Sequence, residues 1–450
     1  MRLLLAGDIH IGRTSTRLGT GGPDGVPRAA GVAGAGFDLT TRSAWHRVVQ
    51  SAVELRCDAV LLSGDVADQE NGFWEAVGPL QEGTARLAKA GIRTVAVAGN
   101  HDHSVLGRLA DTLHPSHFTL LGRGGRWERM TLDREGAPFL HVIGWSFPSS
   151  RVTDSPLASL DLPLDRDLPT LGLVHGDLDA PASVYAPLAS ADLRTRPVDG
   201  WVLGHIHAPA LHRGRDGEPW ILYPGSPQAL HPGETGAHGV WLVEVKGGRV
   251  EAPRPHPLST ARYEEIQVDV GGILDPQGME PHLLHAITKA ARHLHTESGD
   301  HLRHLCLRLT LTGQTRLPEA IPGIREALTR PEFDGGLQVD GVGIHIDAAT
   351  DATVPHLDLE EAAAGPSALG TAARLVLVLE GSREPPPGER QEVQELVERT
   401  RTRLERLRRE RVFHGLQAGV VTEGEAREYL QLGARRLLTA LSAQRSGDGP

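Results

Sequence analysis

The chain has 450 residues, a formal net charge of −11 and two cysteines, so it is long enough for two or three domains with sizeable cores. The acidic total argues against tight unaided binding to nucleic acid, which proteins usually hold through a basic face. Cys57 and Cys306 are far apart in the sequence, which excludes a cysteine metal motif. No apolar run is long enough to span a bilayer, which excludes a membrane-spanning helix.

The first predicted strand, residues 2–6, follows Met1 without the pattern of a signal peptide, and with so few cysteines we expect a cytoplasmic protein. This strand ends at Gly7-Asp8-Ile9-His10. Residues i and i+2 of an extended chain point the same way, so Asp8 and His10 can reach one metal ion together. A glycine- and alanine-rich stretch, residues 13–37, is predicted to form the loop that follows.

Four further predicted strands end in polar motifs of the same kind. They are residues 58–62, 94–98, 170–174 and 200–203, which end at Gly64-Asp65, Gly99-Asn100-His101-Asp102, His175-Gly176-Asp177 and Gly204-His205-Ile206-His207. In layered α/β folds, ligands collect at the carboxyl ends of strands. Five such endings in one chain therefore indicate a shared site rather than unrelated turns.

The other elements of this part of the chain are expected to complete an α/β domain. Helices are predicted at residues 42–56 and 73–90, and strands at residues 139–144 and 239–245. The proline-rich residues 253–257 are interpreted as a linker.

The rest of the chain is predicted to form a small α+β domain and a helical tail. Strands and helices alternate from residue 263 to residue 347. Helices then cover residues 389–412 and 423–443. One stripe of the first of these tail helices suits either a partner protein or packing on its own domain; it consists of Val393, Val397, Leu404 and Leu407.

The polar motifs favour a site for two metal ions. Carboxylates, an amide and imidazoles suit borderline divalent cations such as Mn²⁺ better than a structural zinc site, which usually uses cysteine. Two such ions carry more positive charge than Asp8 and Asp65 neutralise, so the site would attract a phosphate and favour its hydrolysis. His101 could assist the leaving oxygen, and Asp102 could either orient that imidazole or cap the turn.

This ordered set of motifs resembles the calcineurin-like metallophosphoesterases over residues 1–250. Within this superfamily, the sequence resembles the SbcD/Mre-eleven group of DNA repair exonucleases, in particular its bacterial YhaO-like branch. The resemblance lies in the residues around Gly7-Asp8-Ile9-His10, in the Gly-Asn-His-Asp motif and in the additional C-terminal residues. The resemblance implies a four-layer α-β-β-α sandwich at residues 1–252, a capping α+β domain at 262–350 and a helical tail at 356–445.

The resemblance also implies a role for each polar residue. One metal would be held by Asp8, His10 and His207, the other by Asn100, His175 and His205, with Asp65 between them and His101 assisting the leaving group. It implies a Mn²⁺-dependent nuclease acting on DNA ends or single strands. The tail would dock on the coiled coil of an SMC-like ATPase of the SbcC type, and the nuclease could form a homodimer.

Two other functions are compatible with the same motifs. A small-molecule or cyclic-nucleotide phosphodiesterase would use the same metal site but has no evident need for the C-terminal residues. A non-catalytic adaptor would keep the fold only for binding, although the intact ligand set argues against it.

Overall fold

The computed structural model describes residues 1–15, 39–68, 72–164, 167–215, 217–330, 337–408 and 421–447. The chain forms two compact units. The first comprises Met1–Ile266, Ala286–Leu309 and Glu326–Ala349, and the second Gln267–His285, Thr310–Arg325 and Thr350–Pro450. Most of the predicted loop at 13–37 lies outside the described residues.

The first sheet contains the first three strands that were predicted to end in polar motifs. Its order is β12-β11-β1-β2-β3-β4, and β13 also pairs with β11. Strands β1, β2, β3 and β4 are parallel to their neighbours, whereas β11 is antiparallel to β1. The bounds are Arg2–Ala6 (β1), Ala59–Leu62 (β2), Arg93–Ala96 (β3), Phe118–Leu120 (β4), Gly239–Lys246 (β11), Arg249–Val250 (β12) and Arg254–Pro257 (β13).

The second sheet contains the other two of these strands, β7 and β8. Its order is β5-β6-β7-β8-β10-β9, in which β6, β7, β8 and β10 are parallel. The bounds are Glu128–Arg134 (β5), Ala137–Trp145 (β6), Thr170–His175 (β7), Gly200–Gly204 (β8), Ala210–His212 (β9) and Trp220–Tyr223 (β10).

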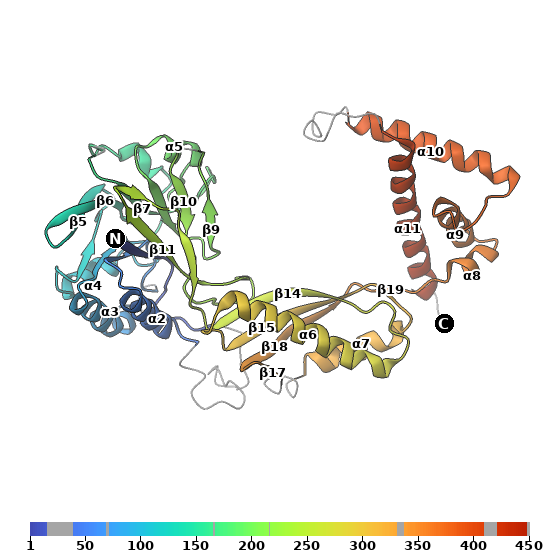
Figure 1. Cartoon of the computed structure of the whole chain (residues 1–450), viewed down its shortest axis with the longest axis horizontal. Coiled ribbons are helices and arrows are strands. Elements are labelled where there is room, and N and C mark those ends of the chain that lie inside the picture. Colours follow the sequence, from blue (N-terminus) through green and yellow to red (C-terminus); the bar gives the residue numbers. More distant parts are fainter. Residues whose placement is uncertain are drawn as a thin grey trace. The chain divides into compact units, whose positions relative to one another are not determined.

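Alternating apolar residues build the layers of this unit. In β1, Leu3 and Leu5 face the second sheet, while Leu4 and Ala6 face the helices, as period-two strand geometry requires. The helices on the first sheet are α2 (Thr41–Glu54), α3 (Gly72–Lys89) and α4 (Leu106–Thr112) (Figure 1). The short α5 (Ser190–Thr195) and the loops beside it cover the outer face of the second sheet. The predicted α-β-β-α fold class is confirmed.

The expected linker at residues 253–257 is instead largely a strand. Residues Arg254–Pro257 form β13, which pairs antiparallel with β11. Its prolines lack a backbone N–H, but proline is tolerated on an edge strand that has no neighbour on its other side. The sequence argument was wrong here because it gave proline the weight of a chain breaker.

A smaller four-stranded sheet follows, with the order β14-β15-β18-β17. The alternation of strands and helices predicted for this segment is present. Its elements are β14 (Ala261–Asp269), α6 (Pro276–Ser298), β15 (His304–Thr312), the short β16 (Gln314–Thr315), α7 (Ile321–Leu328), β17 (Gln338–Val339), β18 (Val342–Asp351) and β19 (Val354–Pro355).

The C-terminal residues are helical, as predicted. The helices are α8 (Leu359–Ala364), α9 (Ala368–Leu379), α10 (Pro387–Arg408) and α11 (Glu423–Gly447). Three residues of the predicted stripe on α10, namely Val393, Val397 and Leu404, pack in a cluster with α9 and α11, whereas Leu407 is exposed. Most of the stripe therefore packs within its own unit, which was the second of the two alternatives. No helix among the described residues is long and apolar enough to cross a membrane.

Candidate metal centre

The carboxyl ends of five strands bring the predicted ligands together. Asp8 and His10 follow β1, Asp65 follows β2, and Asn100 comes four residues after β3. In the second sheet, His175 is the last residue of β7, and His205 and His207 follow β8. Because these strands run parallel within each sheet, their ends meet along one edge of the domain.

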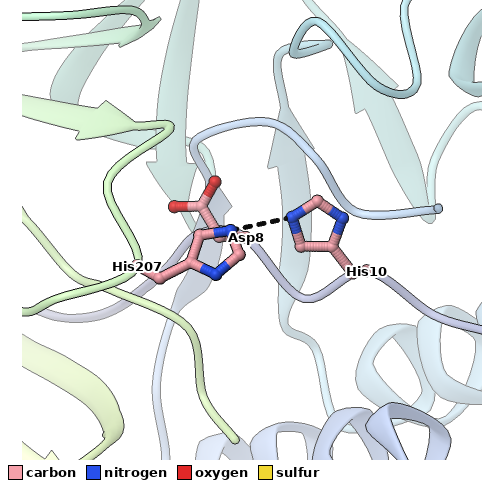
Figure 2. A group of neighbouring side chains, drawn as sticks. All are labelled: Asp8, His10 and His207. Atoms are coloured by element: carbon pink, nitrogen blue, oxygen red, sulfur yellow. Dashed lines mark hydrogen bonds between the residues drawn. The ribbon is translucent and has the colours of Figure 1, made fainter. Parts of the chain in front are cut away.

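The first group of ligand atoms belongs to Asp8, His10 and His207, which all lie within 4.8 Å of one another. Figure 2 shows the two imidazoles facing each other beside the carboxylate, with 3.1 Å between the Nε2 atoms of His10 and His207. Asp8 and His10 are fully buried. Because both side chains are buried, the surrounding protein holds them in place, as a metal-binding site requires.

The second group contains Asp65, His175 and His205. The amide oxygen of Asn100 lies 2.9 Å from His175 Nε2 and 3.1 Å from His205 Nδ1. Asp65 Oδ2 lies 3.5 Å from His175 Nε2 and 3.7 Å from His10 Nε2, an atom of the first group. Asp65 therefore stands between the two groups, as a bridging carboxylate would.

One buried oxygen shows that these residues fit a cation. Asp8 Oδ2 has no hydrogen-bond partner among the described residues, although it is inaccessible to water. A buried carboxylate oxygen without a donor costs free energy unless a cation compensates it. The donor set of oxygen and imidazole nitrogen atoms suits borderline divalent ions.

Several of these ligands have a strained backbone. The φ angles are +50° at Asp8, +49° at His10, +49° at Asp65 and +97° at His205. Residues other than glycine rarely adopt positive φ angles. Such residues cost on the order of 1–3 kcal/mol each and cluster at functional sites. The positive φ at His205 interrupts the extended geometry that would point residues i and i+2 the same way, and His205 and His207 point to different groups.

Glycines beside the ligands allow the ligand-bearing loops to approach one another closely. A Cβ atom at Gly99 would lie 2.1 Å from Asp65 Oδ1, and one at Gly204 would lie 2.1 Å from the carbonyl oxygen of Ser63. Any side chain at these positions would displace a ligand or the loop that holds it. Gly99 and Gly204 are therefore required by the geometry of the site.

The family model of the calcineurin-like phosphoesterases matches residues 1–209, a stretch that contains all the predicted ligands. Residues 1–209 form a calcineurin-like phosphoesterase domain. The two ligand groups described above lie wholly inside this domain.

Two curated relatives give the phosphoesterase domain its context. The uncharacterized metallophosphoesterase YhaO of Bacillus subtilis is 29% identical over 239 residues, which cover 51% of this chain and 56% of the relative. The DNA double-strand break repair protein Mre11 of Haloferax volcanii is 29% identical over 247 residues, which cover 51% of this chain and 49% of the relative. The chain thus spans about half the length of the curated relatives it matches.

A solved structure of a dimetal phosphatase from Danio rerio is also similar, at 12% sequence identity and a TM-score of 0.34. The similarity covers 55% of this chain and 93% of that one.

Charges within the phosphoesterase domain set the protonation states of its ligands. Burial raises the pKa of Asp8 to about 7, although nearby His207 opposes the shift. Burial also acts to raise the pKa of Asp65, but the imidazoles of His175, His10 and His101 outweigh it, so this pKa lies below its usual value. Asp65 is therefore ionised at neutral pH, whereas Asp8 is poised to exchange a proton for a cation.

Three of the histidines are kept neutral. Burial lowers the pKa of His175 to about 4, and it also lowers the pKa values of His10 and His205. Burial opposes protonation of His207 too, but its contact with Glu234 outweighs this and raises its pKa. Neutral imidazoles have a free lone pair, so His10, His175 and His205 can bind a metal without first losing a proton.

The carboxylate facing His101 is not the one that the sequence suggested. His101 Nδ1 lies 3.7 Å from Asp68 Oδ1, and the same oxygen lies 3.4 Å from His10 Nδ1. Arg13 holds the other oxygen of Asp68 at 3.0 Å. Asp68 lies three residues after the predicted ligand Asp65, but its sequence position alone did not assign it a role.

Asp102 instead joins the loop that follows β2 to the loop that follows β3. Its carboxylate accepts hydrogen bonds from the backbone N–H groups of Val66 at 2.7 Å, Ala67 at 3.3 Å and Gly99 at 2.7 Å. Burial and the charge of Asp65 raise its pKa to about 8, against the effect of these donors. The structure therefore gives Asp102 the turn-capping role, which was the second alternative for this residue.

Two further carboxylates contact ligand histidines. Glu234 Oε1 lies 2.7 Å from His207 Nδ1, and Asp177 Oδ1 lies 3.3 Å from His205 Nε2. Asp177 follows a predicted ligand by two residues, so its proximity could have been anticipated. Glu234 lies 27 residues after its histidine, and no pattern in the sequence pointed to it.

Proposed function

We propose that this chain is a two-metal phosphodiesterase that degrades DNA from its ends, as an SbcD-like exonuclease in DNA repair. The observation that carries the proposal is the pair of ligand groups with Asp65 between them, since two-metal sites suit the in-line displacement at a phosphodiester. The names of the Mre11 relatives connect a domain of this kind to double-strand break repair.

The ligands divide between two sites in this proposal. Asp8, His10 and His207 would hold the first ion, and Asn100, His175 and His205 would hold the second, with Asp65 between the two groups. Two Mn²⁺ ions, when bound, supply positive charge to the phosphoryl oxygens and lower the pKa of water to near neutrality. The oxygen of Asn100 binds without adding negative charge, so the site keeps a net attraction for the anionic substrate.

His101 completes the chemistry at the leaving group. Its ring packs edge-on against His10, with 5.0 Å between centroids, and its side chain is 24% exposed and can meet a substrate. Asp68 faces Nδ1 and so favours a proton there, which leaves Nε2 to exchange a proton with the leaving oxygen. Asp68 is in turn held by Arg13.

We also propose the division of labour along the chain. Residues 1–252 form the nuclease domain, residues 262–350 a capping domain, and residues 356–445 a tail that docks on an SMC-like ATPase of the SbcC type. A homodimer working in the cytoplasm fits this arrangement. An ATPase partner also fits the acidic charge of −11, because it would add DNA-binding surface to a chain whose net charge does not favour tight binding on its own.

The exposed face of α11 is the surface that we propose for docking. Tyr429, Leu432 and Leu437 on this helix are 56%, 49% and 53% exposed, whereas most of the stripe on α10 is packed. Replacing these three residues by alanine is expected to abolish co-purification of the ATPase while DNA-independent hydrolysis stays normal. Undiminished co-purification would exclude this face.

The function is tested with end-labelled linear DNA incubated with the purified chain and Mn²⁺, beside Mg²⁺ and a His101→Ala control. We expect Mn²⁺-dependent shortening of the DNA, and a rate lower by roughly a hundredfold or more in the variant, the usual scale for a general acid. Hydrolysis of bis-p-nitrophenyl phosphate without any cleavage of DNA would indicate a small-molecule phosphodiesterase. A chain that binds no metal and hydrolyses neither substrate would be an adaptor.

A further inference from the structure

The two histidines that follow β8 each lie between a metal-ligand group and a different carboxylate. His207 directs Nε2 to His10 at 3.1 Å and Nδ1 to Glu234 at 2.7 Å. Figure 2 shows the metal-facing side of this ring. His207 therefore uses Nε2 on its metal side and Nδ1 on its carboxylate side.

His205 has the opposite arrangement. Its Nδ1 lies 3.1 Å from the Asn100 amide oxygen of the second ligand group, and its Nε2 lies 3.3 Å from Asp177 Oδ1. The ring of Tyr185 packs against this imidazole, with 4.8 Å between centroids. The two neighbouring histidines thus present different nitrogen atoms to the two metal positions.

Glu234 is fixed before any metal binds. Its side chain is 5% exposed, and its second oxygen accepts from the Leu230 N–H at 2.7 Å and from the Ser226 hydroxyl at 3.4 Å. The exposed ring of His231 also approaches Oε1, at 3.2 Å. With Oε2 held by the loop, Oε1 has one direction in which to point, and His207 lies there.

Asp177 is fixed in a comparable way. Its second oxygen accepts a hydrogen bond of 2.5 Å from the Ser183 hydroxyl, and its backbone N–H donates to the Tyr185 carbonyl at 3.0 Å. The loop that packs Tyr185 on His205 therefore also orients the carboxylate behind that histidine.

We propose that Glu234 and Asp177 are positioning residues, one for each metal ion. Glu234 holds the proton of neutral His207 on Nδ1, and Asp177 holds the proton of neutral His205 on Nε2. A neutral imidazole has a single lone pair, so an acceptor behind one nitrogen leaves the other nitrogen free to bind a cation. The inference rests on the proposed two-metal site but concerns residues outside its ligand set.

The test uses the isosteric variants Glu234→Gln and Asp177→Asn, singly and together, in the full chain. Mn²⁺ binding is measured by calorimetry. Each single variant is expected to weaken one of the two ions by roughly 10- to 100-fold, the usual effect of removing such a partner, and to leave the other unchanged. Because the two carboxylates serve different ions, the double variant is expected to weaken both.

A second measurement separates positioning from a merely structural role. Long-range ¹H–¹⁵N spectra of the metal-free chain report which ring nitrogen carries the proton. Although burial opposes it, Glu234 raises the pKa of His207, so the pH is increased until the ring signals of both histidines stop changing and both rings are neutral. We expect the proton on Nδ1 of His207 and on Nε2 of His205, and a mixture at the affected ring in each variant. Signals are assigned from their loss in His207→Gln and His205→Gln.

A matched control is Glu218→Gln. Glu218 lies in the same compact unit, and its carboxylate contacts Arg194 and the Arg215 N–H rather than a histidine. This variant is expected to match the wild type in both measurements. Unchanged protonation and Mn²⁺ affinity in both single variants would overturn the positioning role, and weakening of the same ion by both would overturn the assignment of one carboxylate to each metal. The spectra need no metal, so they decide the positioning role even if the wild type binds no Mn²⁺, a result that would refute the proposed function instead.

Discussion

Replacing Asp102 by alanine separates the two roles that this residue could have. In the structure, Asp102 accepts hydrogen bonds from the buried backbone N–H groups of Val66, Ala67 and Gly99. It therefore connects the loop after β2 to the loop after β3. Alanine would leave these donors without a partner and far from water. The main effect is therefore expected on stability rather than directly on the chemical step.

The size of the effect follows from the shortest contacts. Two of the bonds measure 2.7 Å, and an orphaned buried donor costs about 1–3 kcal/mol, which gives a loss of about 2–6 kcal/mol from these two bonds alone. The free energy of unfolding is measured by urea denaturation in the presence of EDTA, so that loss of metal does not contribute. A domain of ordinary stability would be close to its unfolding threshold after such a loss.

Asp68→Asn is the matched comparison. Asp68 faces His101 and the buried His10, and its pair with Arg13 is partly exposed, so removing its charge is expected to cost less stability than Asp102→Ala. Its hydrolysis rate should nevertheless fall, because His101 loses the carboxylate at Nδ1. If Asp102→Ala instead unfolds at the wild-type urea concentration and lowers only the rate, Asp102 orients His101 and the role assigned from the structure is wrong.

Three further predictions concern the metal ions. Asp65→Asn is expected to reduce the metal content measured by elemental analysis, because the bridging position loses its charge; two Mn²⁺ ions retained per chain would refute this. Burial raises the pKa of Asp8 to about 7, so below that pH its proton competes with the metal. Mn²⁺ affinity measured by calorimetry is therefore expected to fall by up to about tenfold per pH unit below about pH 7. An affinity that stays constant between about pH 5 and 7 would contradict this prediction. Mn²⁺ at about 100 times its dissociation constant should stabilise the fold by about 2.7 kcal/mol for each ion bound, seen as a rise in the thermal midpoint that EDTA reverses.

The sequence was sufficient to predict the convergence of the ligands because one rule of topology governs it. Asp8, Asp65 and Asn100 follow parallel strands of one sheet, and His175 and His205 come at the ends of parallel strands of the other. Once the strands are recognised, their carboxyl ends must share an edge. The α/β class followed from the alternation of buried strands and amphipathic helices, whereas the four-layer arrangement was implied by the family resemblance.

Contacts that depend on irregular loops could not be predicted in the same way. The partner of His207, Glu234, is supplied by a loop that closes through hydrogen bonds to Leu230 and Ser226, and no periodic pattern encodes that closure. The roles of Asp68 and Asp102 were uncertain for a similar reason, since their side chains point according to loop backbones rather than to strand geometry. The stripe on α10 was visible in the sequence, but the helices that cover it were not.

The strain in the site and its unpaired charge have a common physical explanation. Asp8, His10, Asp65 and His205 adopt positive φ angles, and Asp8 Oδ2 is buried without a donor among the described residues. Each of these features destabilises the metal-free fold. Of the nine non-glycine residues with a positive φ among the described residues, four are predicted ligands. A bound cation would compensate the oxygen of Asp8 and offset the backbone strain through several ligand bonds at once. The free-energy cost of these features is therefore compensated when metal binds. A turn with only a structural role would have no such compensation.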